Sequence, residues 1–202
     1  PRDAMACCEQ SIKLLNNDNS RILSMVKLQA KLQLAISCFE ACDTIKAIRH
    51  AEESVSASNS LNDTEYKITA LSILSYLYCK NHQFNKAESC LSEHLDYLRN
   101  LINNELAGMT TEQKQRLWNK CEHNFIVYRN IIEKSDKNAD LLSKLFNYTL
   151  FSKSLLLDFD IQHKNNNISR LNIDWKDIQQ HLSNDAIAIE FIATKEDKGD
   201  YC

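Results

Sequence analysis

Residues 74–88 read LSYLYCKNHQFNKAE, and this stretch decides the fold class. Up to Cys79, apolar residues recur every three or four positions, which is the period of a helix with a buried face. The polar triplet Asn81-His82-Gln83 interrupts this pattern, and a second helical series begins at Phe84. Two helices joined by so short a connection pack antiparallel. The stretch therefore predicts a helical hairpin.

The same periodicity extends along most of the chain in both directions. Polar breaks that contain residues with cap and turn chemistry separate one apolar series from the next. The expected helices cover about residues 5–15, 22–39, 45–55, 65–77, 84–106, 110–132 and 139–162. We expect a Ser/Asn-rich connection over Ser56 to Asp63, and capping boxes at Asn62 with Glu65 and at Thr110 with Gln113.

The composition favours the same all-α class. The 202 residues include two glycines and one proline, whereas β-proteins use many of both in their turns. No run approaches the ~18 uninterrupted apolar residues of a membrane-spanning helix, so we expect no membrane span. A formal charge of −3 argues against a nucleic-acid surface. The start of the chain lacks the features of a signal peptide and an initiating methionine, so we expect it to begin inside a longer product.

The eight cysteines fall mostly at helix-periodic positions, where a thiol acts as a small apolar group. We therefore expect reduced thiols and a cytoplasmic protein. Cys38 with Cys42, and Cys90 with His94, have the spacing of metal ligands on one helix face. No second pair stands at a recognisable distance from either, so packing is the better interpretation, and we expect no metal or other cofactor.

The last forty residues have a different character. After the polar residues 164–173, Asp174 is placed to cap a short helix that ends near Leu182. The run Ala186 to Ala193 is then the one β-branched apolar segment of strand length. A single strand is not stable alone, so this one should pair with a further part of a longer chain or with a second copy.

Two helix pairs repeat at a distance of 40 residues, because Leu34 and Ala47 correspond to Leu74 and Ala87. The segment Phe84-Asn85-Lys86-Ala87-Glu88 resembles the second-helix opening of a tetratricopeptide repeat (TPR). A small residue at this position lets the helices of a pair approach closely, and pairs then stack into a superhelix. The repeat is longer than the usual length of roughly 34 residues and lacks the consensus Gly and Pro, so these would be divergent repeats.

A second resemblance covers the later part of the chain. The segments Leu117-Trp118-Asn119-Lys120 and Leu145 to Leu157 are similar to the end of the TPR arm in bacterial CHAT proteins, which carry a caspase-like domain associated with TPRs. Trp175-Lys176-Asp177-Ile178-Gln179 and Asp185 to Phe191 look like the first helix and strand of that domain. The resemblance implies a TPR-like domain over residues 1–163, a linker over 164–173 and a CHAT fragment over 174–202. The connection before Asp174 is shorter than in the family.

The resemblance implies a scaffold that binds a protein or peptide partner, or regulates an adjoining CHAT domain in cis. The concave groove of TPRs corresponds to eight positions on the two leading helices: Leu32, Ile36, Phe39, Thr69, Ser72, Tyr76, Cys79 and Lys80. The alternative interpretation of Leu32, Ile36 and Phe39 is core packing. Trp118 and Trp175 are expected to anchor helix–helix contacts.

The chain itself is not expected to be an enzyme. The family's catalytic His and Cys would follow residue 202, and adjacent helical positions such as Ser152 and Lys153 point too far apart to form a dyad. Cys202 has no organised base around it. Two alternatives stay open: the parent protein is a caspase-like cysteine endopeptidase, or the chain is a stand-alone helical adaptor.

Overall fold

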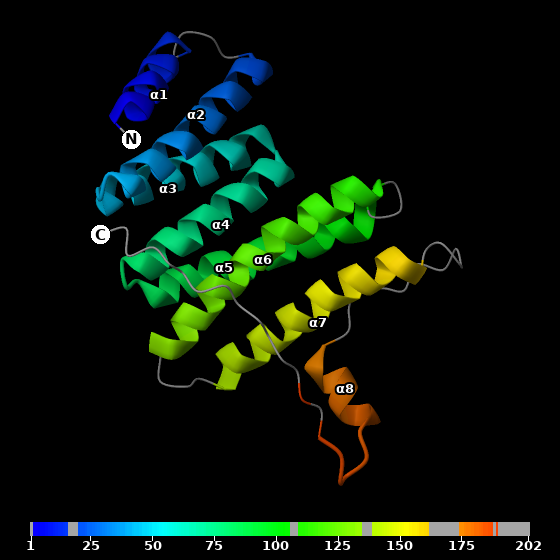
Figure 1. Ribbon diagram of the computed structural model, residues 1–202. Helices are drawn as coiled ribbons and strands as arrows, with labels where there is room; N and C mark the ends of the chain where they lie inside the picture. The colour runs from blue at the N-terminus through cyan, green and yellow to red at the C-terminus, as the bar shows by residue number, and fades with distance from the viewer. Residues whose placement is uncertain are drawn as a thin grey trace. The chain divides into compact units, whose positions relative to one another are not determined.

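A computed structural model describes residues 2–15, 20–105, 109–134, 139–161, 174–187 and 189. Within these residues the chain forms helices and no strand, which confirms the all-helical class (Figure 1). The elements are α1 (Arg2–Leu14), α2 (Arg21–Glu40), α3 (Thr44–Leu61), α4 (Thr64–Lys80), α5 (Phe84–Glu105), α6 (Thr111–Lys134), α7 (Ala139–Ile161) and α8 (Trp175–His181).

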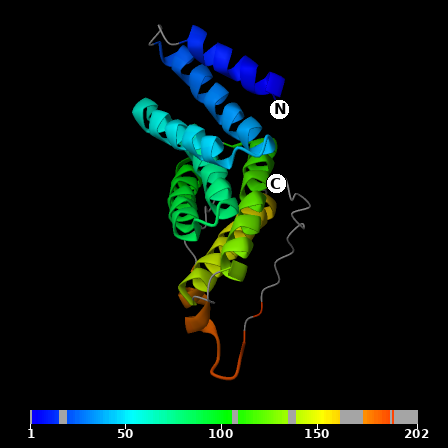
Figure 2. The same cartoon turned by 90° about the vertical axis from the view of Figure 1, so that its left-hand side faces the viewer.

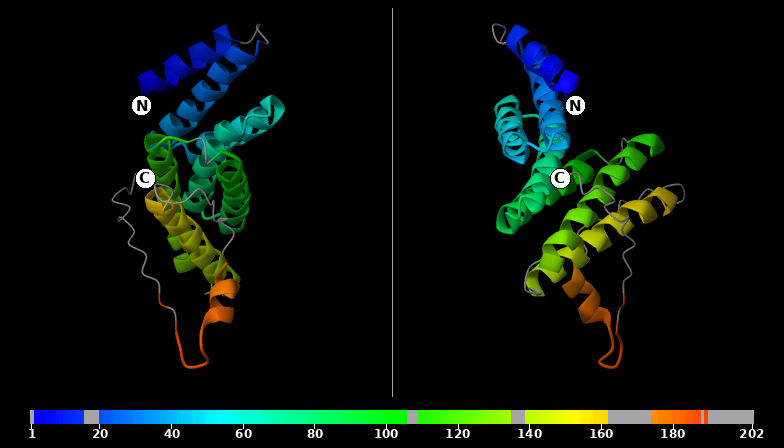
Figure 3. Two further views of the ribbon diagram at one scale, coloured as in Figure 1. Left: turned by 90° about the vertical axis from the view of Figure 1, so that its right-hand side faces the viewer. Right: turned by 60° about the vertical axis from the view of Figure 1, so that its left-hand side comes forward.

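The described residues fall into two compact units, one that ends at Tyr97 and one that begins at Leu98. In unit 1, α1 packs on α2, α2 on α3, and α3 on α4, so that helices adjacent in sequence are also neighbours in space (Figures 1 and 2). In unit 2, α6 and α7 lie side by side and α8 packs on α7 (Figure 3). The predicted linker, residues 164–173, lies outside the described residues.

One turn geometry recurs at the three connections between α2, α3, α4 and α5. Each turn has one residue with a left-handed backbone, and these residues stand 20 positions apart: Cys42 (φ 63°), Asn62 (φ 51°) and His82 (φ 56°). The N–H of the following residue donates to the carbonyl five positions back, which is the closing bond of a Schellman motif. These bonds measure 2.9 Å at Asp43, 3.1 Å at Asp63 and 2.8 Å at Gln83. The chain therefore repeats its helix–turn unit without using glycine.

The same turn residues start the next helix. The carboxylate of Asp43 accepts from the backbone N–H of Lys46 at 3.1 Å, and that of Asp63 accepts from Tyr66 at 3.0 Å. Each aspartate thus supplies a side-chain acceptor to an N–H that has no partner within the helix. A single three-residue turn ends one helix and caps the following one.

The left-handed residue at position 62 gives a first prediction. Asn62→Val destabilises unit 1 by about 1–2 kcal/mol, because a β-branched side chain clashes in the left-handed conformation that this turn requires. Asn62→Gly changes stability by less than about 0.5 kcal/mol, because glycine adopts that conformation without a clash. Urea unfolding followed by circular dichroism measures both values.

The matched control is Asn59→Val, three residues earlier and inside α3, where the backbone is helical. There the same substitution costs only about 0.5 kcal/mol or less, the difference in helix propensity. Equal losses at positions 59 and 62 contradict the assigned role of the turn.

The 40-residue repeat is visible in the burial of its members. Ala47 and Ala87 have 0% exposed surface, and Leu34 and Leu74 are also buried. In α2 and α4, a core cluster joins Leu28 and Leu32 to Ala70. The small residues are thus placed where neighbouring helices leave no room for a longer side chain.

Unit 2 has its own packed centre. Tyr128 of α6 and Tyr148 of α7 are fully buried, with ring centroids 5.4 Å apart. The Tyr148 hydroxyl accepts a hydrogen bond of 3.3 Å from the side-chain amide of Asn124, a residue that is also buried. Aromatic contact and hydrogen bond together fix the register of α6 against α7.

Three local predictions can be compared with these elements. The capping box at Thr110 is confirmed: its N–H donates to Gln113 Oε1 at 2.7 Å, and Gln113 N–H donates to Thr110 Oγ1 at 3.3 Å. The capping box at Asn62 is wrong, because the capping residue is Asp63 and Asn62 is the left-handed residue. The connection expected from Ser56 is wrong up to Leu61, because α3 continues through these residues.

The short helix after Asp174 is confirmed as α8, and Asp174 with Asp177 forms a capping box at its start. The expected strand is not seen at residues 186, 187 and 189, which have no regular secondary structure. Ile187 and Ile189 are 84% and 72% exposed. The rest of that run lies outside the described residues.

Candidate functional site

The eight predicted groove residues lie on α2 and α4, two helices that contact each other within unit 1. Phe39 and Tyr76 join them through an edge-to-face contact, with ring centroids 5.6 Å apart and an interplanar angle of 79°. The Lys80 ammonium lies 5.5 Å from the centroid of the Tyr76 ring, within reach of a cation–π attraction. These three side chains are half-buried and form the centre of the candidate surface, which we call the α2–α4 face.

The other five residues divide into two groups. Ile36, Thr69 and Ser72 are half-buried and extend the α2–α4 face, and the Thr69 hydroxyl donates to the Glu65 carbonyl at 3.1 Å. Leu32 and Cys79 are only 3% and 5% exposed. The last two therefore supply packing beneath the face rather than surface that a partner could reach.

The repeat length points to two further candidate positions for this face, which the prediction did not include. Gln29 stands 40 positions before Thr69, and Glu40 stands 40 positions before Lys80. Both side chains are exposed on α2. Applying the repeat spacing to each predicted position in turn would have found them, because equivalent residues of stacked repeats face the same way. The extended face is mixed in charge and rich in hydrogen-bonding groups.

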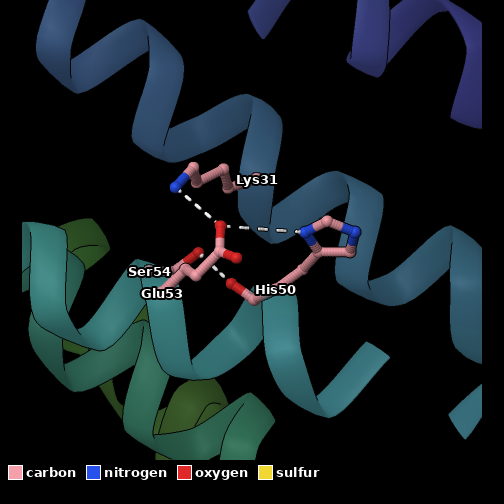
Figure 4. Close-up of polar contacts among 4 residues, drawn as sticks. All are labelled: Lys31, His50, Glu53 and Ser54. Atoms are coloured by element: carbon pink, nitrogen blue, oxygen red, sulfur yellow. Dashed lines mark hydrogen bonds and ion pairs between the residues drawn. The ribbon is translucent and has the colours of Figure 1, made fainter. Parts of the chain in front are cut away.

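Beside α2, on α3, the ring of His50 has a buried Nδ1 atom without a hydrogen-bond partner. This atom lies 4.0 Å from Glu53 Oε2, which accepts a hydrogen bond from Lys31 Nζ of α2 at 2.7 Å (Figure 4). Burial lowers the pKa of His50 below its usual value, and the hydrogen bond from Lys31 lowers the pKa of the Glu53 carboxyl.

Two further polar contacts hold the helices of unit 1 together. Lys67 of α4 is buried, and its ammonium lies 2.8 Å from Glu93 Oε1 and 2.7 Å from the Tyr97 hydroxyl. The Tyr78 hydroxyl of α4 donates to the Glu52 carboxylate of α3, and its pKa is raised by burial and by this bond. These pairs link α3, α4 and α5.

The thiols of Cys38 and Cys90 lack the lowered pKa of reactive cysteines. Burial raises the pKa of Cys90 to about 11 and also raises that of Cys38, which disfavours the thiolate that attacks substrates or binds metals. In the described part of the chain, no three His, Cys, Asp or Glu residues gather closely enough to hold a metal ion. Cys7, Cys8, Cys38 and Cys90 are free thiols, as expected. Cys42 departs from that expectation because it is disulfide-bonded.

His94 is buried and its Nδ1 lies 2.9 Å from the carbonyl oxygen of Ile68. A carbonyl only accepts, so this nitrogen carries the proton and ties α5 to α4. The packing role expected at Cys90 and His94, instead of metal binding, agrees with the buried position of His94. The side chains of Ser152, Lys153 and Trp118 are not among those that the structure describes.

Unit 2 contains an open groove of about 590 Å³ between α7, α8 and the residues that follow α8. Apolar side chains dominate its lining, among them Leu142, Phe146, Trp175, Ile178 and Leu182. The Trp175 backbone N–H donates to Asn147 Oδ1 at 2.8 Å, so the start of α8 is bonded to α7. This bond is made by the backbone, so the expected role of the Trp175 ring as a helix anchor stays a prediction.

No known protein family, curated protein or solved structure matches this chain. In the described residues, α2 is long and apolar enough to cross a membrane by length and composition alone. The buried core helix of a globular domain meets the same criteria, and α2 buries Leu28, Leu32, Leu34, Ala35, Ser37 and Cys38 in unit 1. The expectation that the chain has no membrane span stays a prediction.

Proposed function

We propose that this chain is a non-enzymatic, TPR-like interaction scaffold that binds a segment of a partner protein on the α2–α4 face. The observation that carries the proposal is the half-buried cluster of Phe39, Tyr76 and Lys80. Tyrosine is, with tryptophan and arginine, among the residues that most often carry binding energy at protein interfaces.

The charge of the chain and the side chains of the face support a protein partner over a nucleic acid. The chain has a formal charge of −3, and the face mixes acidic, basic and uncharged side chains. The polar side chains of Thr69, Ser72 and Gln29 lie on the same two helices as the aromatic pair. Helical repeats that stack side by side present such residues as a continuous ridge, which fits an extended or helical segment.

The test is a selection of peptides from a random phage-displayed library on the purified chain, followed by calorimetric titration of the selected peptides. Tyr76→Ala weakens their binding by about 5- to 30-fold, which corresponds to a loss of roughly 1–2 kcal/mol at an interface anchor. The charge reversal Lys80→Glu weakens binding to a similar extent or changes which peptides are selected, and it leaves the helix core untouched.

Ile45→Ala is the matched control, because Ile45 is a large apolar residue that is 79% exposed on α3, outside the α2–α4 face. Its removal leaves the affinity of the selected peptides unchanged. Selected peptides that bind the Tyr76 and Ile45 variants equally well, or a selection that enriches none, argue against this face as the binding site.

We also propose that partner binding acts in cis on an adjoining CHAT-type domain that would begin with α8. The contact of Trp175 with Asn147 offers a physical connection from α7 to α8. Limited proteolysis with mass spectrometry tests whether the end of the chain is organised. Protection up to about residue 195 supports the proposal, because a packed segment resists cleavage. Trimming to the region of Asn165 with an unchanged melting temperature contradicts it.

A further inference from the structure

The cluster of Lys31, His50 and Glu53 has a property that the scaffold role does not require. Glu53 has one strong partner, the Lys31 ammonium 2.7 Å away on the neighbouring helix α2. It also lies near a second possible partner on its own helix, His50 Nδ1 at 4.0 Å, a distance too long for a hydrogen bond. The carboxylate therefore stands between an interhelical and an intrahelical partner (Figure 4).

The choice between these partners depends on the proton of His50. With Nδ1 unprotonated, this atom has no N–H to donate to the carboxylate, and it is buried without a hydrogen-bond partner. Once protonated, Nδ1 becomes a charged donor whose nearest acceptor is Glu53. To form that bond the carboxylate must move by about 1 Å toward His50, since charge-assisted N–H···O bonds are shorter than 3 Å.

Charged groups from three helices act on this site. Arg49 and Glu53 belong to α3, Lys31 to α2 and Glu9 to α1. The two cations oppose a charge on His50, and the two carboxylates favour it. Burial is the largest influence and disfavours the charge, so the pKa of His50 lies below that of an unfolded histidine.

The sign of the pH effect follows from this direction. An unfolded or opened chain takes up a proton at His50 near pH ~6.5, whereas the closed structure takes it up only at lower pH. As the pH falls below about 6.5, protonation therefore favours the open form. The Glu53 carboxyl, with its lowered pKa, loses its contribution only below about pH 4.5, so the two effects occur in separate windows.

We propose that Lys31, Glu53 and His50 form a pH-sensitive latch in which acidification transfers Glu53 from Lys31 of α2 to His50 of α3. The transfer replaces an ion pair between helices with one inside a helix, and α2 loses a polar link to α3. The latch is independent of partner binding on the α2–α4 face, and its test uses the chain alone.

Hydrogen exchange with mass spectrometry on the whole chain measures the opening of α2 and α3 directly. Between about pH 7.5 and 5.5, after correction for the intrinsic exchange rate, protection of α2 and α3 in the wild-type chain falls about two- to fivefold, the range expected for a partly exposed ion pair. His50→Leu removes this pH dependence. Lys31→Met raises exchange in α2 and α3 already at the higher pH because the interhelical bond is missing, and it keeps only the part of the pH dependence that comes from the burial of His50.

His82→Asn is the matched control: His82 is exposed, and asparagine accepts its left-handed backbone. This variant keeps the full pH dependence in α2 and α3. If His50→Leu does not fold, His50→Gln serves as the test, because glutamine is also uncharged and keeps a polar group at this position. A pH dependence that is the same in the wild-type chain and in the His50 variant overturns the proposal, as does exchange in Lys31→Met at the higher pH that equals that of the wild-type chain.

Discussion

Tyr148→Ala lowers the free energy of unfolding by about 3–5 kcal/mol relative to the wild-type chain. This is the range for truncation of a large buried aromatic residue. Tyr148 of α7 has 0% exposed surface and packs its ring against Tyr128 of α6. Removal of the ring leaves a cavity between the two helices that its rigid neighbours fill only in part. Urea unfolding followed by circular dichroism, together with near-ultraviolet signals from tyrosine, reports the loss.

Tyr148→Phe separates the ring from its hydroxyl. This variant keeps the ring but removes the acceptor for the buried amide of Asn124, so it costs only about 1–2 kcal/mol. A matched surface control is Leu142→Ala on the same helix, where the side chain is 46% exposed and its removal has a smaller effect. If Tyr148→Ala and Leu142→Ala lose equal stability, α6 and α7 do not share the packed centre described here.

The second large effect is expected from overpacking at the repeated alanine. Ala87→Leu destabilises unit 1 by about 2–3 kcal/mol, because a core without free space accommodates a longer side chain only by moving α4 and α5 apart. Ala87 is completely buried. Since Ala47 occupies the equivalent place 40 residues earlier and is equally buried, Ala47→Leu has a similar cost. Chemical denaturation measures both variants.

The control is Ala6→Leu, an exposed position inside α1, where added apolar surface changes stability by less than about 0.5 kcal/mol. Unequal costs at positions 47 and 87 would show that the two helix pairs are not structurally equivalent. A cost near zero at both would falsify the close approach of the helices in each pair.

The sequence by itself determined the features that depend on residues a few positions apart. Helical periodicity and the near absence of glycine and proline predicted the fold class, and Thr110 with Gln113 predicted a helix start that the structure contains. The 40-residue spacing of Ala47 and Ala87 predicted two equivalent helix pairs. Hydrogen bonds within a helix and at its caps join residues three to five positions apart, so a short window of sequence contains all the information they need.

Even these local predictions failed where two local solutions compete. Asn62 and Asp63 can each cap a helix, and the Ser/Asn-rich composition of residues 56–61 is compatible with a loop. The choice of Asp63, and the extension of α3, were decided by the packing of α3 on α2 and α4, which buries Ser54 and Ser58. Burial on one helix face stabilises a helix beyond its intrinsic propensity.

Contacts between distant residues were decided by the tertiary structure alone. Nothing within reach of Phe39 in the sequence indicates that its ring meets Tyr76, and periodicity could not separate Ile36, which stays half-buried, from Leu32, which is in the core. The bond of Glu53 to Lys31, beside His50 on its own helix, likewise appears only after α2 and α3 have packed. The physical reason is that the rotation of one helix about its axis against another sets which side chains meet, and this rotation is fixed by the combined packing of all the residues at the interface.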